Sequence, residues 1–356
     1  MKKSRLLAST MLLGSVAAYA DVVNFSTFVS GASINAVEGV HDTIAFAFAG
    51  NKFVGTVYNG AAGGLALQLY QTDLNGGSVA KFGNPLPSGS GEIVLGSSQG
   101  QGGFGNGDVF AGADGNIYHY ANGGGAPALF ATPGGGTIRG IQFDNAGGLY
   151  GGRMLVTTSS GNVYAISSAG VATLLASTGE DTEGMDIATT NWGPYAGQLL
   201  VSSEGSGRLR FISPTGVITN VDSSAGVHIT VVEAEVAAFV PLNFGASGNP
   251  LEGFYAANYA VDIQKSTGDF SGLLGHALIT SEEGSNSRVW DLTYNSGTGF
   301  FALNATPVGH LPNQSEDGFF LTADKVAASV PEPSSIVLLS SVMLGVGLRL
   351  RRRLRG

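Results

Sequence analysis

Four stretches of the sequence align when laid over one another: DVFAGADGNIYHYANGGG (108–125), RMLVTTSSGNVYAISSAG (153–170), QLLVSSEGSGRLRFISPTG (198–216) and HALITSEEGSNSRVWDLTYNSG (276–297). Each one contains an apolar strand, a short polar turn with Gly, an alternating strand and a second Gly turn. Strand patterns separated by Gly turns predict β-hairpins. We therefore expect an all-β fold built from successive hairpins.

The spacing of these hairpins predicts the number of repeating units in the body. Phe110 and Val156 are 46 residues apart, Val156 and Val201 are 45 apart, and Ile279 follows after 78, which corresponds to two shorter units. A period of roughly 40–45 residues with four strands per unit is typical of β-propeller blades. The six blades that this period predicts are 43–82, 92–131, 137–176, 183–222, 229–266 and 276–326.

Ring closure completes the predicted architecture. A lone blade cannot bury both of its faces, so its neighbours must cover them, and the strand around 22–28 is expected to complete the last blade. Seven blades, or a β-sandwich with a second small sheet, remain alternatives. No stretch of 21–328 has the apolar period and caps of a helix.

The composition agrees with a packed body. Only 12% of the 356 residues are charged, 56 are Gly and none is Cys. Low charge with plentiful β-forming residues argues against disorder. The lack of Cys excludes a disulfide framework and thiolate metal sites.

The N-terminal segment 1–20 has the pattern of a signal peptide. Basic residues at its start precede an apolar stretch at 6–17, and Ala18 and Ala20 supply the small residues that signal peptidase requires. We expect cleavage between Ala20 and Asp21. The alternative is an N-terminal membrane anchor, for which the stretch is short.

The C-terminal segment 329–356 has three ordered parts. Pro331, Glu332 and Pro333 form a stiff, non-helical hinge before the apolar run 336–348. The basic end that follows includes Arg351, Arg352 and Arg353 and would stay on the cytoplasmic side of the membrane. Because the run is marginal for a permanent span, it suits a segment that is recognised and then cut.

This three-part segment resembles the PEP-CTERM sorting signal. The resemblance implies a membrane-bound, exosortase-like processing enzyme that cuts near the Pro-Glu-Pro motif. It also implies export through the inner membrane to the cell surface or medium, often in bacteria that make exopolysaccharide and biofilm. A plain C-terminal membrane anchor is the alternative. The resemblance says nothing about the body, 21–328.

The net charge of the body excludes some classes of binding partner. Without the two terminal segments, 9 basic and 25 acidic residues remain, which gives a net charge of −16. Such a body repels nucleic acid and anionic membrane surfaces, so we expect no nucleic-acid partner. We expect it to attract divalent cations or cationic partners, and the alternative is that the charge only keeps the body soluble.

Acidic residues recur at equivalent places in the repeat. Glu183, Glu235 and Glu316 open strands, whereas Glu204 and Glu282 end strands before Gly. Because the innermost strands of a propeller line its central channel, these five carboxylates are expected to converge near the axis. Converging carboxylates repel one another and favour a cation, and Ca²⁺ accepts six to eight oxygen ligands. The alternative is that they cap turns and accept backbone N–H bonds.

The Glu-Gly strand openings are also similar to those of six-bladed propellers of the NHL, lactonase and phytase-like types. This resemblance implies a calcium-dependent hydrolase. The Asn and Asp ligands that such enzymes need cannot be assigned in this sequence, and no catalytic residue is identified.

Two functions from different classes are therefore predicted. The first is a non-enzymatic binding or structural propeller of the cell surface, and the second is a calcium-dependent propeller hydrolase. A surface polysaccharide is a candidate partner for the first, since exposed aromatic rings can stack on sugars. The aromatic residues near expected loops and strand ends, which could equally be core residues, are Trp192, Tyr195, Phe254, Tyr255, Tyr259 and Trp290.

Overall fold

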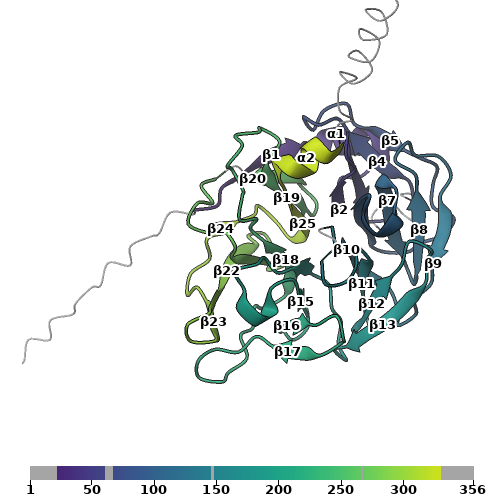
Figure 1. The fold of residues 1–356 in the computed structure, drawn as a ribbon. Helices are drawn as coiled ribbons and strands as arrows, with labels where there is room; N and C mark the ends of the chain where they lie inside the picture. The colour runs from purple at the N-terminus through teal and green to yellow at the C-terminus, as the bar shows by residue number, and fades with distance from the viewer. Residues whose placement is uncertain (1–21, 61–66, 146–147, 267, 330–356) are drawn as a thin grey trace, which may run out of the picture.

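Six β-sheets surround one central axis in the computed structural model, which describes residues 22–60, 67–145, 148–266 and 268–329 (Figure 1). The innermost strands of the sheets contact one another in the closed cyclic order β2, β6, β10, β14, β18, β25. The six-bladed, all-β propeller predicted from the sequence is confirmed.

The first three blades each use four consecutive strands in antiparallel order. Blade one consists of β2 (Thr43–Phe48), β3 (Phe53–Val57), β4 (Leu69–Thr72) and β5 (Ala80–Phe82). Blade two consists of β6 (Ile93–Gln99), β7 (Asn106–Ala113), β8 (Asn116–Tyr120) and β9 (Ala128–Ala131). Blade three consists of β10 (Ile138–Phe143), β11 (Met154–Thr158), β12 (Asn162–Ile166) and β13 (Ala172–Ser177).

Blade four follows the same plan, and the last two blades do not. Blade four consists of β14 (Met185–Ile187), β15 (Leu199–Ser202), β16 (Leu209–Ile212) and β17 (Ile218–Asn220). Blade five consists of β18 (Ala234–Phe239), β21 (Ala277–Ser281), β22 (Arg288–Asn295) and β23 (Phe300–Leu303), with β24 (Gly309–His310) also paired to β22. Blade six consists of β25 (Ser315–Leu321), β19 (Gly253–Asn258), β20 (Asp262–Ser266) and β1 (Phe25–Val29).

The boundaries expected for the last two blades, 229–266 and 276–326, are therefore wrong. The inner strand β18 pairs with β21, and the β19–β20 hairpin between them pairs instead with β25 of the next blade. A local strand pattern does not record which inner strand a hairpin joins. The closure by the N-terminal strand is confirmed, since β1 pairs with β20.

Two short α-helices and two 3-10 turns complete the described chain, although no helix was expected in the body. These elements are α1 (Gly31–Glu38), α2 (Ala323–Ser329), η1 (Gln101–Gly103) and η2 (Gly193–Tyr195). Helix α1 begins at Ser30, whose side chain accepts a hydrogen bond from the Ser33 N–H, and ends at Gly39 with φ 80°. Such local caps stabilise a helix that lacks a long apolar period.

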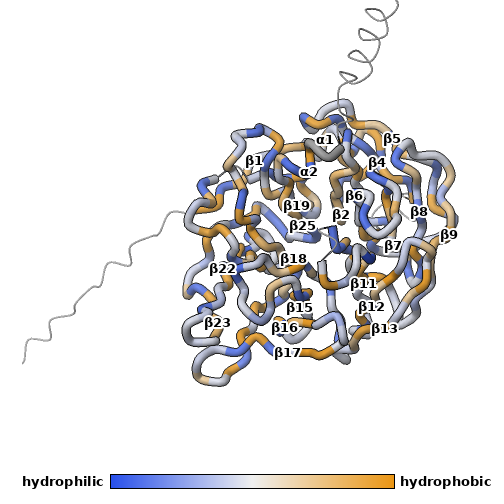
Figure 2. Tube along the Cα trace, viewed as in Figure 1, coloured by the Kyte–Doolittle hydropathy of each residue, from blue (hydrophilic) through white to orange (hydrophobic). Residues whose placement is uncertain are grey.

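The core lies between neighbouring blades. Fully buried side chains such as Val54 and Val109 belong to one apolar cluster that joins blades one and two, and comparable clusters occur around the ring. Figure 2 shows hydrophobic segments in the blades and hydrophilic segments close to the axis. The packing of blade against blade thus fixes the inner strands that line the channel.

The inner strands run in the same direction along the axis, so the channel has two different mouths. Each inner strand starts at one mouth, called here the acidic mouth, where Glu183, Glu235 and Glu316 lie. Each ends at the other, called the pocket mouth, where a cavity of about 630 Å³ is lined by the strand ends and by Lys325 of α2.

Candidate metal centre at the acidic mouth

All five glutamates predicted from the repeat lie at the acidic mouth. Glu183 precedes β14, and Glu235 and Glu316 lie near the start of β18 and β25. Glu204 and Glu282 follow β15 and β21, the strands that pair with β14 and β18. Because a strand beside the inner one runs in the opposite direction, its end reaches the mouth where the inner strand begins.

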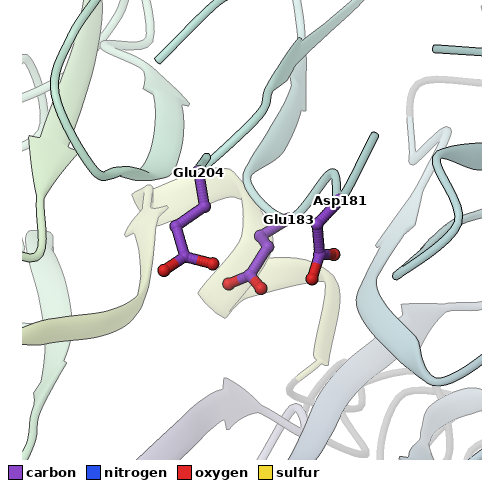
Figure 3. Close-up of side chains that lie close together, drawn as sticks. All are labelled: Asp181, Glu183 and Glu204. Atoms are coloured by element: carbon purple, nitrogen blue, oxygen red, sulfur yellow. The ribbon is translucent and has the colours of Figure 1, made fainter. Parts of the chain in front are cut away.

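Three carboxylates lie close together, two from the connection before β14 and one from the turn after β15. Asp181, Glu183 and Glu204 each place one carboxylate oxygen within 4.8 Å of the other two (Figure 3). Oxygen atoms at these separations can be ligands of one cation.

The next glutamate around the axis is joined to this group. The side chains of Glu183 and Glu235 share a hydrogen bond and are only 8% and 6% exposed. Within the described residues, Oε2 of Glu235 has no hydrogen-bond partner. A buried carboxyl oxygen without a partner costs folding free energy, so this atom is a candidate ligand position.

Arg139 provides the positive charge of the site. Its guanidinium lies 2.5 Å from Glu92 Oε2, 2.8 Å from Asp181 Oδ2 and 3.1 Å from Glu183 Oε1. Burial disfavours its charge, but the surrounding carboxylates raise the pKa of Arg139 above its ordinary value. Arg139 occupies, in the third blade, the place that Glu183 and Glu235 occupy in the next two.

One arginine does not neutralise this mouth. Burial, together with the neighbouring carboxylates, raises the pKa of Glu183 and of Glu282 to about 7 and that of Glu316 to about 9. Burial and the charge of Glu183 raise the pKa of Glu235 well above its ordinary range. Glu235 therefore binds its proton more tightly than an exposed carboxyl group does, and Glu183 is the acceptor of the hydrogen bond between the two.

The sequence did not identify every member of the site. Glu92 and Asp181 were missed, and Arg139 was not among the candidate site residues. Glu92 stands directly before its inner strand, and Asp181 lies two residues before Glu183. Comparing all residues within four positions of each inner-strand start would have found both.

The aromatic residues considered for sugar stacking pack in the core instead. Trp192, Phe254 and Tyr255 are at most 1% exposed. Tyr195 and Trp290 pack against the apolar cluster around Trp192, and Tyr259 packs against that of blades one and two. These residues therefore form no exposed aromatic platform.

The fold and this mouth define a class: a six-bladed propeller whose axis ends in a ring of carboxylates with one arginine. At its C-terminal end, residues 329–353 match the PEP-CTERM protein-sorting motif. The chain thus carries a signal of exported proteins that are processed by exosortases, which confirms this part of the sequence analysis.

Solved structures similar to the body show the fold alone. A chain of the nidogen/laminin complex is 11% identical, with a TM-score of 0.50 over 79% of this chain and 85% of that one. A streptogramin B lyase is 11% identical, with a TM-score of 0.47 over 80% and 74%. Virginiamycin B lyase from Staphylococcus aureus is 10% identical, with a TM-score of 0.43 over 79% and 87%. No curated protein matches the sequence.

The two terminal segments lie largely outside the described residues. This applies to the expected cleavage between Ala20 and Asp21 and to the processing residues Pro331, Glu332, Pro333, Arg351, Arg352 and Arg353. Among the residues that the structure does describe, no helix is long and apolar enough to cross a membrane.

Proposed function

We propose that this protein is an exosortase-sorted component of the cell surface, and that its body is a non-enzymatic binding propeller that holds Ca²⁺ at the acidic mouth. The observation that carries the calcium site is the buried, unpartnered Oε2 of Glu235 among carboxylates contributed by several blades. The ligand atoms on offer are carboxylate oxygens, which suit a hard cation.

A cation would take the place of protons in the cluster. The raised pKa values of Glu183, Glu282 and Glu316 mean that these groups resist simultaneous ionisation in the free protein. A bound Ca²⁺ would release those protons and draw the carboxylates of Glu183, Glu204 and Glu235 toward one centre.

A calcium-dependent hydrolase is the second candidate. It is favoured by Glu183 and Glu235, two neighbouring buried carboxyl groups whose pKa values are both raised, as in many acid–base sites. Against it stands the channel behind Arg139, Glu183, Glu235 and Glu316, whose cavity is about 60 Å³. Ligand pockets are commonly about 300–1,000 Å³, so this space suits an ion with water better than an organic substrate.

A surface polysaccharide remains the proposed partner of the body, and the pocket mouth is the place that fits it. Its cavity of about 630 Å³ is within the range of small-molecule sites. Gln99, Asn145 and Phe319 are among the lining residues, and Oδ1 of Asn145 is buried without a hydrogen-bond partner. Amide groups beside an aromatic ring offer hydrogen bonds and a stacking surface to one sugar unit.

Processing at both ends is part of the proposal. We propose that signal peptidase cuts between Ala20 and Asp21 and that an exosortase-like enzyme cuts near Pro331, Glu332 and Pro333. Intact-mass spectrometry of the protein from the host's surface or medium is expected to show a chain that starts at Asp21 and lacks the arginine-rich end. A full-length chain with Arg351–Arg353, recovered from the cytosol, would contradict both cuts.

The calcium site is tested by thermal unfolding with and without Ca²⁺. Ligand binding to the folded state alone raises stability, by about 2.7 kcal/mol at a ligand concentration 100 times the Kd. We expect a clear rise of the melting midpoint for the natural protein and none for Glu235→Gln. Glu235→Gln should fold normally, because the amide can also donate a hydrogen bond to Glu183.

The matched control is Asp269→Asn, which removes an exposed carboxylate. Asp269 follows the end of β20, on the side of the body away from the acidic mouth. This variant should keep the full calcium response. An unchanged midpoint of the natural protein at millimolar Ca²⁺, or an equal response in Glu235→Gln, would remove the proposed site.

A further inference from the structure

The chain leaves the described body at the pocket mouth, through helix α2. We infer that the pocket mouth faces the bilayer, and the acidic mouth faces away from it, for as long as the sorting segment is attached. The partner surface is an anionic lipid bilayer, which the pocket mouth approaches without inserting.

Helix α2 is fixed to the body, so the exit point of the chain is fixed too. The Ala323 N–H donates a hydrogen bond to Glu252 Oε1 at 3.1 Å, and Lys325 Nζ donates one to the Phe320 carbonyl at 3.1 Å. Val326 is 7% exposed and packs in the apolar cluster that includes Tyr255. Swinging α2 away would break these contacts together.

The link from α2 to the apolar run is short. Residues 330–335 separate Ser329 from Ile336, where the run begins. A fully extended chain spans at most about 3.6 Å per residue, so the seven steps from Ser329 to Ile336 reach at most about 25 Å. The body is therefore held close to the bilayer by its pocket mouth.

The acidic mouth is too far from the exit point of the chain to face the bilayer. Glu316 and Leu321 stand near opposite ends of β25, five residues apart, which corresponds to about 17 Å along a strand. Turning the body over would require the link to cover at least this thickness before it reached the bilayer, which would leave at most about 8 Å of its length.

The side chains at the two mouths favour the same orientation. At the acidic mouth, carboxylates outnumber the guanidinium groups of Arg139, Arg210 and Arg288, and an anionic bilayer repels such a surface. At the pocket mouth, Lys325 lines the cavity together with Asp144, Asp186, Asp317 and Asp324, and the exposed side chains of Leu149 and Leu242 stand at its edge. The exposed leucines, rather than the charge, therefore favour this mouth as the one beside the bilayer. Cutting the sorting segment would therefore free the pocket mouth, while the acidic mouth faces the solution from the start.

Because the sequence contains no Cys, single-cysteine labelling tests this orientation directly. The positions are Leu242→Cys, at the edge of the pocket, and Gly205→Cys, at the acidic mouth next to Glu204. Both are exposed, and a Cβ at Gly205 meets no atom within 4 Å. Each uncut chain, with its sorting segment, would carry an environment-sensitive fluorophore and be reconstituted in phosphatidylglycerol-containing vesicles with a headgroup nitroxide lipid.

We expect quenching several-fold stronger at position 242 than at position 205, and equal emission from both after detergent replaces the vesicles. Equal quenching at both positions in vesicles, or stronger quenching at position 205, overturns the inference. Leu149→Cys provides a second pocket-mouth position if Leu242→Cys does not fold, as judged by its melting midpoint. The result does not depend on whether Ca²⁺ binds.

Discussion

Buried carboxyl groups occur at both ends of the channel, and they differ in the hydrogen bonds that they accept. At the pocket mouth, Asp186 accepts hydrogen bonds from Gln142 Nε2 at 2.9 Å, from the Ile187 N–H at 2.8 Å and from the Phe239 N–H at 2.7 Å. At the acidic mouth, Glu235 Oε2 has no such partner within the described chain.

The comparison separates a structural carboxyl group from a candidate ligand. Asp317, at the pocket mouth, likewise accepts the Phe46 N–H at 3.0 Å and so joins blade six to blade one. Within the described residues, its sequence neighbour Glu316 accepts no such hydrogen bond from a backbone N–H, and it is surrounded by other carboxylates. Hydrogen bonding to backbone donors, rather than burial, thus distinguishes the two groups.

The largest expected effect comes from removing a structural carboxyl group. Asp186→Ala leaves the backbone N–H groups of Ile187 and Phe239 and the amide of Gln142 without an acceptor. Each unpaired buried donor costs about 1–3 kcal/mol, so we expect the free energy of unfolding to fall by about 3 kcal/mol or more. Urea unfolding measures this value.

Without Ca²⁺, Glu235→Gln at the acidic mouth should change the free energy of unfolding by less than about 1 kcal/mol. The uncharged amide of Gln can donate a hydrogen bond to Glu183, as the carboxyl group of Glu235 does. Equal losses for Asp186→Ala and Glu235→Gln would show that the two mouths do not differ in the way described.

A smaller effect is expected from pH. The folded-state pKa values of Glu183 and Glu282 are about 7 and that of Glu316 is about 9, above the ordinary value of 4.5. Between pH 5 and 9 the folded state therefore binds more protons than the unfolded state, and stability falls as pH rises. We expect a loss of about 2 kcal/mol over this interval after allowance for solvent screening.

Added Ca²⁺ should restore most of the lost stability at pH 8, and it should raise stability little at pH 5, where protons compete for the same oxygens. Urea unfolding at both pH values, with Ca²⁺ or a chelator, gives the four numbers required. Stability that rises with pH in the chelator series would show that ionisation of the carboxylates at the acidic mouth does not destabilise the folded state.

Much of the fold was accessible from the sequence because blades one to four are chains of consecutive hairpins. The expected ranges 43–82 and 92–131 begin and end within one residue of the observed strands. The same local reasoning paired the hairpin of β19 and β20 with β18, since adjacency in sequence was the only guide. Their true neighbour, β25, lies some 50 residues further along the chain.

The site was predicted in part for a related reason. Repeat position indicated that Glu183, Glu235 and Glu316 would meet, because inner strands converge on an axis. It did not indicate the side-chain geometry, by which Arg139 turns toward Asp181 and Glu92. That arrangement depends on how neighbouring blades tilt, which a single sequence does not state.

The interleaving of the last two blades has a consequence for export. Blade six is assembled from β1, the β19–β20 hairpin and β25, which are separate pieces of the chain. The innermost piece, β25, ends at Leu321, just ahead of α2 and the sorting segment. A chain that crosses the membrane from its N-terminus delivers this piece nearly last. The ring of blades can then close only when translocation is almost complete. The chain therefore stays incompletely folded until the sorting segment reaches the membrane.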